Sequence, residues 1–437
     1  MNKKLNILVL HFLRDPKEAR AVLLKLVFFL RKYKPEHKYL YHDVSLPIPE
    51  YVKDFKFDGI ILDVTLLCLR YPYHKKYYEF LIKNFDFVRH SDAVKIAFPQ
   101  DEYDCSELLD NWMIKWGVDL VISPLADNPV INEIYKKYSK IGKIAQGYTG
   151  YIDKDFFDLK NKVMPFEKRK VDICYRARKL PPYFGKIGEL KWRIADIVKD
   201  KSKKYNLITD ISYKEKDTII GEKWYEFLGN SKFTLGSLSG SSLIDPRGEI
   251  QEKVREYCRK KPDYTYEEVE QLFYPGMDKY NFTAISPRNI EAAFTLTGQI
   301  LVEGPYSGIL EPWVDYIPLK PNGSNFNEVY EAMVDKKFAM QVIQNCYAKI
   351  VETKDLYYET VANKIINFIY EYKTKKHVQS ENNELMFNNL LEKYNREMRL
   401  KYKAYFNYLH FRKKVSAIFD LLPYGKELKK IIKNRVL

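Results

Sequence analysis

Short apolar segments alternate with longer amphipathic ones along most of this chain, and that alternation restricts the fold more than any other feature. In the first part, Pro16–Lys32, Lys76–Phe87 and Ser106–Trp116 have helical periodicity and separate the apolar runs. Apolar runs of strand length between amphipathic helices are typical of a parallel α/β sheet. The predicted strands of this part are 5–12, Gly59–Val64, Val94–Phe98 and Val118–Ile122.

The alternation stops over 146–170, which holds two glycines and a charged run, and then begins again. We interpret 146–170 as the connection between two domains. The second part has predicted helices over Gly188–Val198 and Pro287–Leu296, and predicted strands over Val171–Tyr175, Lys204–Thr209, Lys232–Leu235 and Gln299–Val302. A chain of 437 residues is long enough for two such cores. We therefore predict two Rossmann-like α/β domains with a cleft between them, over 1–165 and 170–345, and a helical extension over 350–437.

The composition is that of a folded protein, with 46% hydrophobic and 15% aromatic residues. Its cysteines are odd in number and far apart, which argues against a disulfide framework and against a zinc cluster. The seven histidines show no spacing typical of metal ligands, so we predict no metal site. No uninterrupted apolar stretch reaches the roughly 18 residues that a spanning helix needs. No secretory signal is recognisable either, so a cytoplasmic location is expected.

The net charge of +15 is concentrated at the C-terminal end. Residues 395–437 hold twelve Lys or Arg against three Asp or Glu. Lys426–Leu437 places apolar residues at helical spacing among lysines, which fits a peripheral contact with an anionic membrane surface. A solvated helix that packs its apolar stripe on the protein explains the pattern equally well. A nucleic-acid partner is disfavoured, because the cations gather in a tail and no known binding motif is present.

Ligands of parallel α/β sheets bind beyond the carboxyl ends of the strands, so the segments that follow the predicted strands are candidate sites. Arg176 and Arg178 follow Val171–Tyr175, and guanidinium groups suit phosphate oxygens. Ser239 lies in the small-residue segment after Lys232–Leu235, and Arg247 follows it closely. These segments are predicted to bind a phosphate-bearing ligand, although a plain surface loop and a flexible linker remain open. The lack of a GKS/T ending argues against a nucleotide-hydrolysing loop.

Asp101 and Glu102 follow the strand that ends at Phe98. A carboxylate at this edge could remove the proton of an acceptor hydroxyl group. Consecutive residues of a loop point apart, so only one of the two is expected to face the cleft. Asp101 could instead cap the helix that begins near Ser106. His11, at the end of the first strand, is a further catalytic candidate, although a lone histidine is more often structural.

The segment that begins at Ser286 with Pro287, Arg288 and Glu291 is the most informative of the chain. A proline at a helix start leaves neighbouring backbone N–H groups free, and that end of the helix is electropositive. With an arginine beside it, the helix start is suited to a phosphate group. Glu291, one turn further, could accept hydrogen bonds from a ribose diol. An ordinary helix N-terminus explains the same residues when nothing else is considered.

Phe282–Val329 resembles the nucleotide-binding half of GT-B glycosyltransferases, in particular the "glycosyl transferases group 1" type that includes spore-maturation-protein-like enzymes. In that family a Pro-Arg-x-x-Glu-Ala helix and the strand after it bind the nucleotide diphosphate and the ribose, and Pro287, Arg288 and Glu291 match it. Gly308–Leu319 and the Ser324-Asn325 junction are similar to the elements that follow. The resemblance covers the second half well and the first half loosely.

The resemblance also implies that Glu303 and Tyr306, after the next strand, contribute to the donor site. Many members that retain the anomeric configuration have two glutamates eight positions apart, whereas Glu291 and Glu303 are twelve apart. The stereochemical outcome therefore stays open.

These observations lead to the prediction of a glycosyltransferase that needs no cofactor and no metal, with a nucleotide sugar as the donor substrate. The lysine-rich and tyrosine-rich composition and the resemblance suggest a saccharide or glycolipid acceptor in bacterial surface polysaccharide or glycolipid synthesis. A non-catalytic scaffold that kept the GT-B fold is the alternative, because a fold alone does not establish activity.

Overall fold

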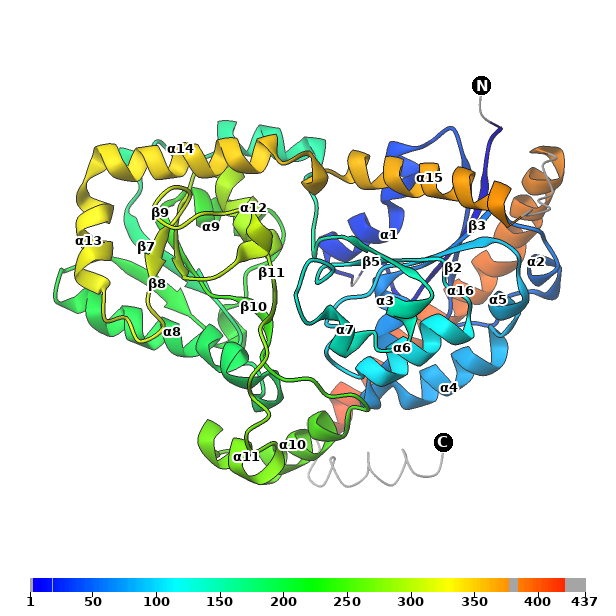
Figure 1. Ribbon diagram of the computed structural model, residues 1–437, viewed down its shortest axis with the longest axis horizontal. Coiled ribbons are helices and arrows are strands. Elements are labelled where there is room, and N and C mark those ends of the chain that lie inside the picture. The colour runs from blue at the N-terminus through cyan, green and yellow to red at the C-terminus, as the bar shows by residue number, and fades with distance from the viewer. Residues whose placement is uncertain (1–2, 18, 377–383, 421–437) are drawn as a thin grey trace.

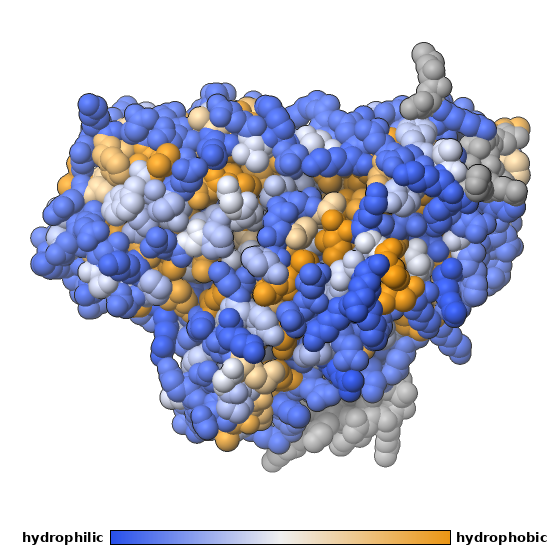
Figure 2. Space-filling view, viewed as in Figure 1, coloured by the Kyte–Doolittle hydropathy of each residue, from blue (hydrophilic) through white to orange (hydrophobic). Residues whose placement is uncertain are grey.

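The computed structural model describes residues 3–17, 19–376 and 384–420. Figure 1 shows two α/β halves side by side, with helices along one edge of both and a smaller helical unit that protrudes below them. Figure 2 shows hydrophilic residues over most of this face, with smaller apolar patches on both halves and on the protruding unit.

The N-terminal sheet has six strands, all parallel, in the order β2-β1-β3-β4-β5-β6. Its central strands are buried on both faces, which is why they are apolar without alternation. Side chains such as Ile7 and Val9 point into one core and Leu8 and Leu10 into the other. The strands are β1 (Asn6–His11), β2 (Lys38–Asp43), β3 (Gly59–Leu62), β4 (Val94–Ala97), β5 (Leu120–Ser123) and β6 (Lys143–Gln146).

Helices cover both faces of this sheet. The longest of them between the strands is α1, on the same core as Ile7 and Val9. The helices are α1 (Ala21–Tyr33), α2 (Glu50–Lys53), α3 (Val64–Leu67), α4 (Lys75–Asn84), α5 (Phe87–His90), α6 (Ser106–Lys115) and α7 (Ile131–Ile134).

The second sheet is also parallel, with the strand order β13-β12-β9-β7-β8. Its strands are β7 (Val171–Arg176), β8 (Thr209–Ser212), β9 (Ser231–Gly236), β12 (Gly298–Val302) and β13 (Ile317–Leu319). The helices of this domain are α8 (Gly185–Lys203), α9 (Glu222–Gly229), α12 (Pro287–Phe294), α13 (Phe326–Val334) and α14 (Lys336–Glu352).

The protruding unit is an insertion between β9 and α12. The antiparallel strands β10 (Ser239–Ser241) and β11 (Phe282–Ala284) form a ribbon, and α10 (Glu249–Lys260) and α11 (Tyr266–Phe273) lie between them in the chain. Near its start, the insertion contacts the N-terminal domain, where the Asp245 amide donates to the Tyr103 carbonyl at 2.9 Å.

After α14 the chain returns to the N-terminal domain. Helix α15 (Tyr358–Lys375) packs its isoleucines into the core that contains Ile7 and Val9. Helix α16 (Glu384–Asp420) packs Phe387, Tyr394 and Met398 into the core on the other face of the sheet. Two parallel α/β domains joined in this way, with a final helix that returns to the first domain, have the GT-B fold. The predicted fold class is thus confirmed.

Some of the expected elements differ. Residues 204–208 are not a strand, because α8 continues to Lys203 and β8 begins only at Thr209. Strands β2 and β6 were missed, since their sequences KYLYHD and KIAQ are short and carry charged or tyrosine side chains. The basic segment Lys426–Leu437 lies outside the described residues. Over the part of the chain that the structure describes, no helix is long and apolar enough to cross a membrane.

Replacing Ile369 of α15 by alanine should lower the free energy of unfolding by about 3 kcal/mol, because a buried isoleucine loses its contacts and leaves a cavity. Ile369 is fully buried, and its Cδ1 lies 2.8 Å from the position that a Cβ atom would take at Gly59. Urea denaturation followed by circular dichroism measures the change. Ile141→Ala is the matched control, since Ile141 is 72% exposed. Equal stability of the two variants would show that α15 does not hold the N-terminal core.

Candidate functional site

The start of helix α12 is capped by its own sequence. The Ser286 hydroxyl accepts a hydrogen bond from the helix backbone, and the Ser286 amide donates one to the Asn289 side-chain oxygen at 3.0 Å. Pro287 occupies the first turn. This capping box orders the helix start, and the helix dipole makes this end electropositive.

The N-terminal domain touches α12 at this point. The Thr149 hydroxyl donates to the Ile285 carbonyl at 2.8 Å. Gly150 packs so closely on Pro287 that a Cβ atom there would lie 2.8 Å from the proline Cγ. The start of α12 therefore lies at the junction of the two domains.

Glu291 lies one turn into α12 and is half-buried. Its carboxylate accepts a hydrogen bond from the Trp224 indole at 2.7 Å. Burial raises the pKa of Glu291 to about 7, against the opposing effects of the Trp224 hydrogen bond and the charges of Arg288 and Lys25. An acceptor group is thus held next to the electropositive helix end.

Arg288 and Arg176 meet at the carboxyl end of β7 but have different surroundings. The exposed Arg288 guanidinium lies 5.2 Å from the Trp224 ring centroid and donates to the Arg176 carbonyl. The Arg176 side chain turns toward β8, where it pairs with Asp210 at 2.8 Å and donates to the Asp217 carbonyl at 3.0 Å. In this structure the Arg176 donors are thus taken up by protein partners, and its phosphate-binding role stays a prediction.

Cations from both domains gather around the start of α12. The pKa of Arg20, directly before α1, is lowered by burial and then by the positive charges of Arg178 and Arg288. Neither Arg20 nor Arg178 forms an ion pair with another described residue. Lys191 of α8 is half-buried, and burial together with the Arg288 charge lowers its pKa to about 8, against the effect of Asp101. An anion would relieve the repulsion within this group, which we call the cation cluster.

Asp101 is exposed on the loop after β4, with a φ of 48°. The buried Arg70 guanidinium shapes this loop, donating to the carbonyls of Gln100, Asp101 and Asp104 at 2.8–2.9 Å. The Tyr103 hydroxyl donates to the Asp101 carboxylate at 2.8 Å. Asp101 is thus an oriented carboxylate, and its charge is felt by Lys191.

Glu102 and His11 are buried in the interior of the N-terminal domain, and their catalytic roles stay predictions. Glu102 is fully buried and accepts a hydrogen bond from the Tyr135 hydroxyl at 2.7 Å. Its pKa is raised to about 7 by burial. His11 is also buried, which lowers its pKa to about 3 and keeps it neutral. Of the three catalytic candidates, only Asp101 is exposed.

The predicted donor site also included Ser239, Arg247, Tyr306 and Glu303. The hydrogen bonds and ion pairs described for these four residues are with parts of the chain other than the start of α12. Ser239 is part of the β10–β11 ribbon, where it pairs with Ala284. Arg247 forms a two-pronged ion pair with Glu107 of α6, at 2.9 and 3.2 Å, and so joins the insertion to the N-terminal domain. Tyr306 is buried, and its hydroxyl donates to the Val302 carbonyl at 2.6 Å. Glu303 is exposed at the carboxyl end of β12.

The sequence analysis missed Arg20 and Lys191. Arg20 falls inside the predicted helix Pro16–Lys32, whereas α1 begins only at Ala21. Lys191 is one of many lysines on amphipathic helices, and no motif marks it. The one signal that could have found Arg20 is its position in the segment that follows the first strand.

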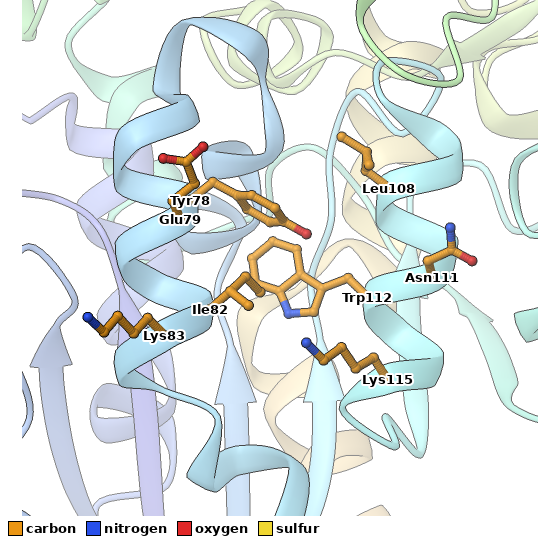
Figure 3. A pocket seen from close by; sticks show the side chains of 8 residues that line it. All are labelled: Tyr78, Glu79, Ile82, Lys83, Leu108, Asn111, Trp112 and Lys115. Carbon is orange, nitrogen blue, oxygen red and sulfur yellow. The ribbon is translucent and has the colours of Figure 1, made fainter.

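A groove of about 380 Å³ lies away from these residues, between α4 and α6 on the N-terminal domain. Figure 3 shows the rings of Tyr78 and Trp112 between the two helices, with Lys83 and Lys115 toward one end. The groove contains none of the predicted site residues. Within the described ranges, no group of three or more His, Cys, Asp or Glu is arranged to hold a metal ion.

No family model matches the sequence, and a comparison with curated proteins found no match. Solved structures with a similar chain path include sucrose-phosphate synthase from Thermosynechococcus elongatus, at 10% identity and a TM-score of 0.48, covering 85% of this chain and 100% of the other. Anabaena Alr3699/HepE in complex with UDP-glucose is similar at 11% identity and a TM-score of 0.45, covering 84% and 100%. An alpha-glucosyltransferase in complex with UDP-glucose and DNA containing an abasic site is similar at 10% identity and 0.46, covering 84% and 99%. At these identities and TM-scores the similarity assigns no functional role to any residue of this chain. Its GT-B fold is inferred from its own two parallel sheets and from helix α15, which returns to the N-terminal domain.

Proposed function

We propose that this protein is a glycosyltransferase that moves a sugar from a nucleotide-sugar donor to a hydroxyl group of a saccharide or glycolipid. The observation that carries the proposal is the capped start of α12 at the domain junction, with Arg288 and Glu291 beside cations from both domains. A sugar diphosphate nucleotide has complementary groups, namely a dianionic diphosphate and a ribose diol. The resemblance of Pro287, Arg288 and Glu291 to the Pro-Arg-x-x-Glu-Ala motif supports the same assignment.

In this proposal the diphosphate binds at the start of α12, with Arg288 and Arg178 from the second domain and Arg20 from the first. When the bond between the sugar C1 and the diphosphate oxygen breaks, negative charge grows on the leaving diphosphate. Fixed cations and backbone N–H groups at that point lower the barrier. The cation cluster thus takes the part that a metal ion plays in other transferases, and we propose that no metal and no cofactor are needed. Glu291 holds the ribose.

Asp101 is the proposed base. It takes the proton of the acceptor hydroxyl as the acceptor oxygen forms its bond to C1, so that the proton ends on Asp101 and the electron pair of the broken bond on the diphosphate. Arg70 is a positioning residue, because it holds the loop that carries Asp101. A role in bacterial surface polysaccharide or glycolipid synthesis is part of the proposal and rests on composition and resemblance.

Nucleotide sugars should raise the melting temperature by a few degrees, because a ligand that binds only the folded state stabilises it. Arg288→Ala should remove most of this shift, whereas Arg193→Ala, on the exposed side of α8, should leave it unchanged. A thermal-shift screen over the common nucleotide types measures both. The absence of a shift from every nucleotide, with a folded protein, would favour the non-catalytic scaffold.

Asp101→Asn should lower kcat by about a hundredfold or more, because the acceptor loses its base. The donor-induced thermal shift should persist in this variant, since Asp101 does not bind the donor. Glu102→Gln should leave kcat within about threefold of the wild type, because the buried carboxyl group does not meet the substrate. Transfer from the donor found by the screen measures both variants. The reverse order of the two effects would mean that Glu102 is the base.

Glu102 should also make stability depend on pH. Its folded-state pKa of about 7 is above the unfolded value of 4.5, so its contribution to stability is present below pH 4.5 and is lost as the pH rises to 7. Relative to Glu102→Gln, the wild type should therefore lose about 3 kcal/mol of unfolding free energy over this range. Urea denaturation across the range measures the difference. Glu107, on the surface, supplies the control. Relative to Glu107→Gln, the wild type should show no such loss of unfolding free energy as the pH rises.

A further inference from the structure

The last described helix, α16, has two different faces. Its inner face packs on the N-terminal domain through Phe387, Leu390, Tyr394 and Met398, all buried. The Tyr394 hydroxyl is 2.8 Å from the Nδ1 of His42, and the Tyr402 hydroxyl accepts from the Asp43 amide at 2.9 Å. These contacts fix the rotation of the helix about its axis and therefore determine which side chains point away from the protein.

The outer face has an apolar stripe formed by Leu400, Ala404, Tyr408 and Phe411. These residues follow one another at intervals of four, four and three, so they lie on one side of a helix. Leu400 is 70% exposed, Tyr408 50% and Phe411 65%. Single exposed apolar residues are common on protein surfaces, whereas a continuous stripe of them indicates an interaction surface.

Cations flank the stripe. Residues 396–414 hold seven Lys or Arg and one acidic residue, Glu397. That glutamate is neutralised by Lys401 at 2.6 Å and also accepts a hydrogen bond from Tyr51. The exposed cations beside the stripe are Arg396, Arg399, Lys403, Arg412 and Lys414.

We propose that the outer face of α16 docks on an anionic lipid bilayer. Leu400, Tyr408 and Phe411 enter the boundary between headgroups and acyl chains, and the flanking cations contact anionic headgroups. The apolar stripe with cations beside it is the arrangement that such a boundary requires. The inference is independent of the donor site and would stand if the proposed function failed.

Two other occupants fit this surface less well. Residues 421–437, which follow α16, hold five Lys or Arg and one Glu, so their charge has the same sign as the face and does not complement it. A nucleic acid would match the cations but offers no apolar layer for Leu400 and Phe411.

Co-sedimentation of the full-length protein with vesicles tests the proposal. The protein should bind vesicles of phosphatidylcholine with roughly 30% phosphatidylglycerol and show little binding to phosphatidylcholine alone, because anionic lipid supplies the attraction. The double variant Leu400→Ser/Phe411→Ser should reduce the bound fraction at least about tenfold, since apolar insertion is lost. Because both side chains are exposed, the variant should keep the wild-type melting temperature.

The matched control is Ile141→Ser/Ile208→Ser, which removes two exposed isoleucines away from α16. It should bind vesicles like the wild type. Equal binding of neutral and anionic vesicles, or full binding by the Leu400/Phe411 variant, would overturn the proposal. Binding of the wild type to single-stranded DNA but not to anionic vesicles, lost in the Leu400/Phe411 variant, would assign the face to nucleic acid instead. A donor-induced thermal shift in the same variant would show that loss of vesicle binding is separate from the donor site.

Discussion

The burial of α15 against the N-terminal sheet is the interaction on which the two-domain arrangement depends. The helix follows α14 of the second domain and places Val361, Ile365 and Ile369 in the core of the first. The chain therefore passes between the two domains twice, once over 147–170 and once from α14 to α15. The insertion adds a polar contact through Arg247 and Glu107. These constraints bring the start of α12 to the loops of the N-terminal domain.

The cation cluster is an arrangement that folding alone would not favour. Like charges from two domains are brought together, since the positive charges of Arg178 and Arg288 lower the pKa of Arg20, and Arg288 lowers that of the half-buried Lys191, in each case after the effect of burial. Buried structural arginines in the same protein are different, since Arg70 and Arg169 give their donors to backbone carbonyls. Arg20 and Arg178 lack such partners among the described residues. Such a group of neighbouring like charges is well explained by an anionic ligand.

The sequence was sufficient to predict the alternation of strands and helices and the central strands of both sheets, because buried parallel strands need continuous apolar runs. It did not predict the outer strands β2 and β6 of the first sheet. It also located the start of α12, since proline, a capping serine and an arginine are local signals. It could not decide where a side chain points at the end of a strand. Arg176 and Arg178 differ by two positions, yet one turns to Asp210 and the other stays free of described ion pairs. The same limit applies to Asp101 and Glu102, because the loop that carries them is held by Arg70, which lies 31 positions before Asp101 in the chain.

The two proposals impose a consistent geometry on the reaction. Every contact described for the inner face of α16 is with the N-terminal domain, so docking through its outer face would hold that domain at the bilayer. Asp101, the proposed base, belongs to the same domain, whereas Arg288 and Glu291 belong to the other. An acceptor that is part of a membrane would then be presented to the fixed domain. The donor domain would remain free to exchange nucleotides with the surrounding water, because none of its described elements takes part in the docking surface.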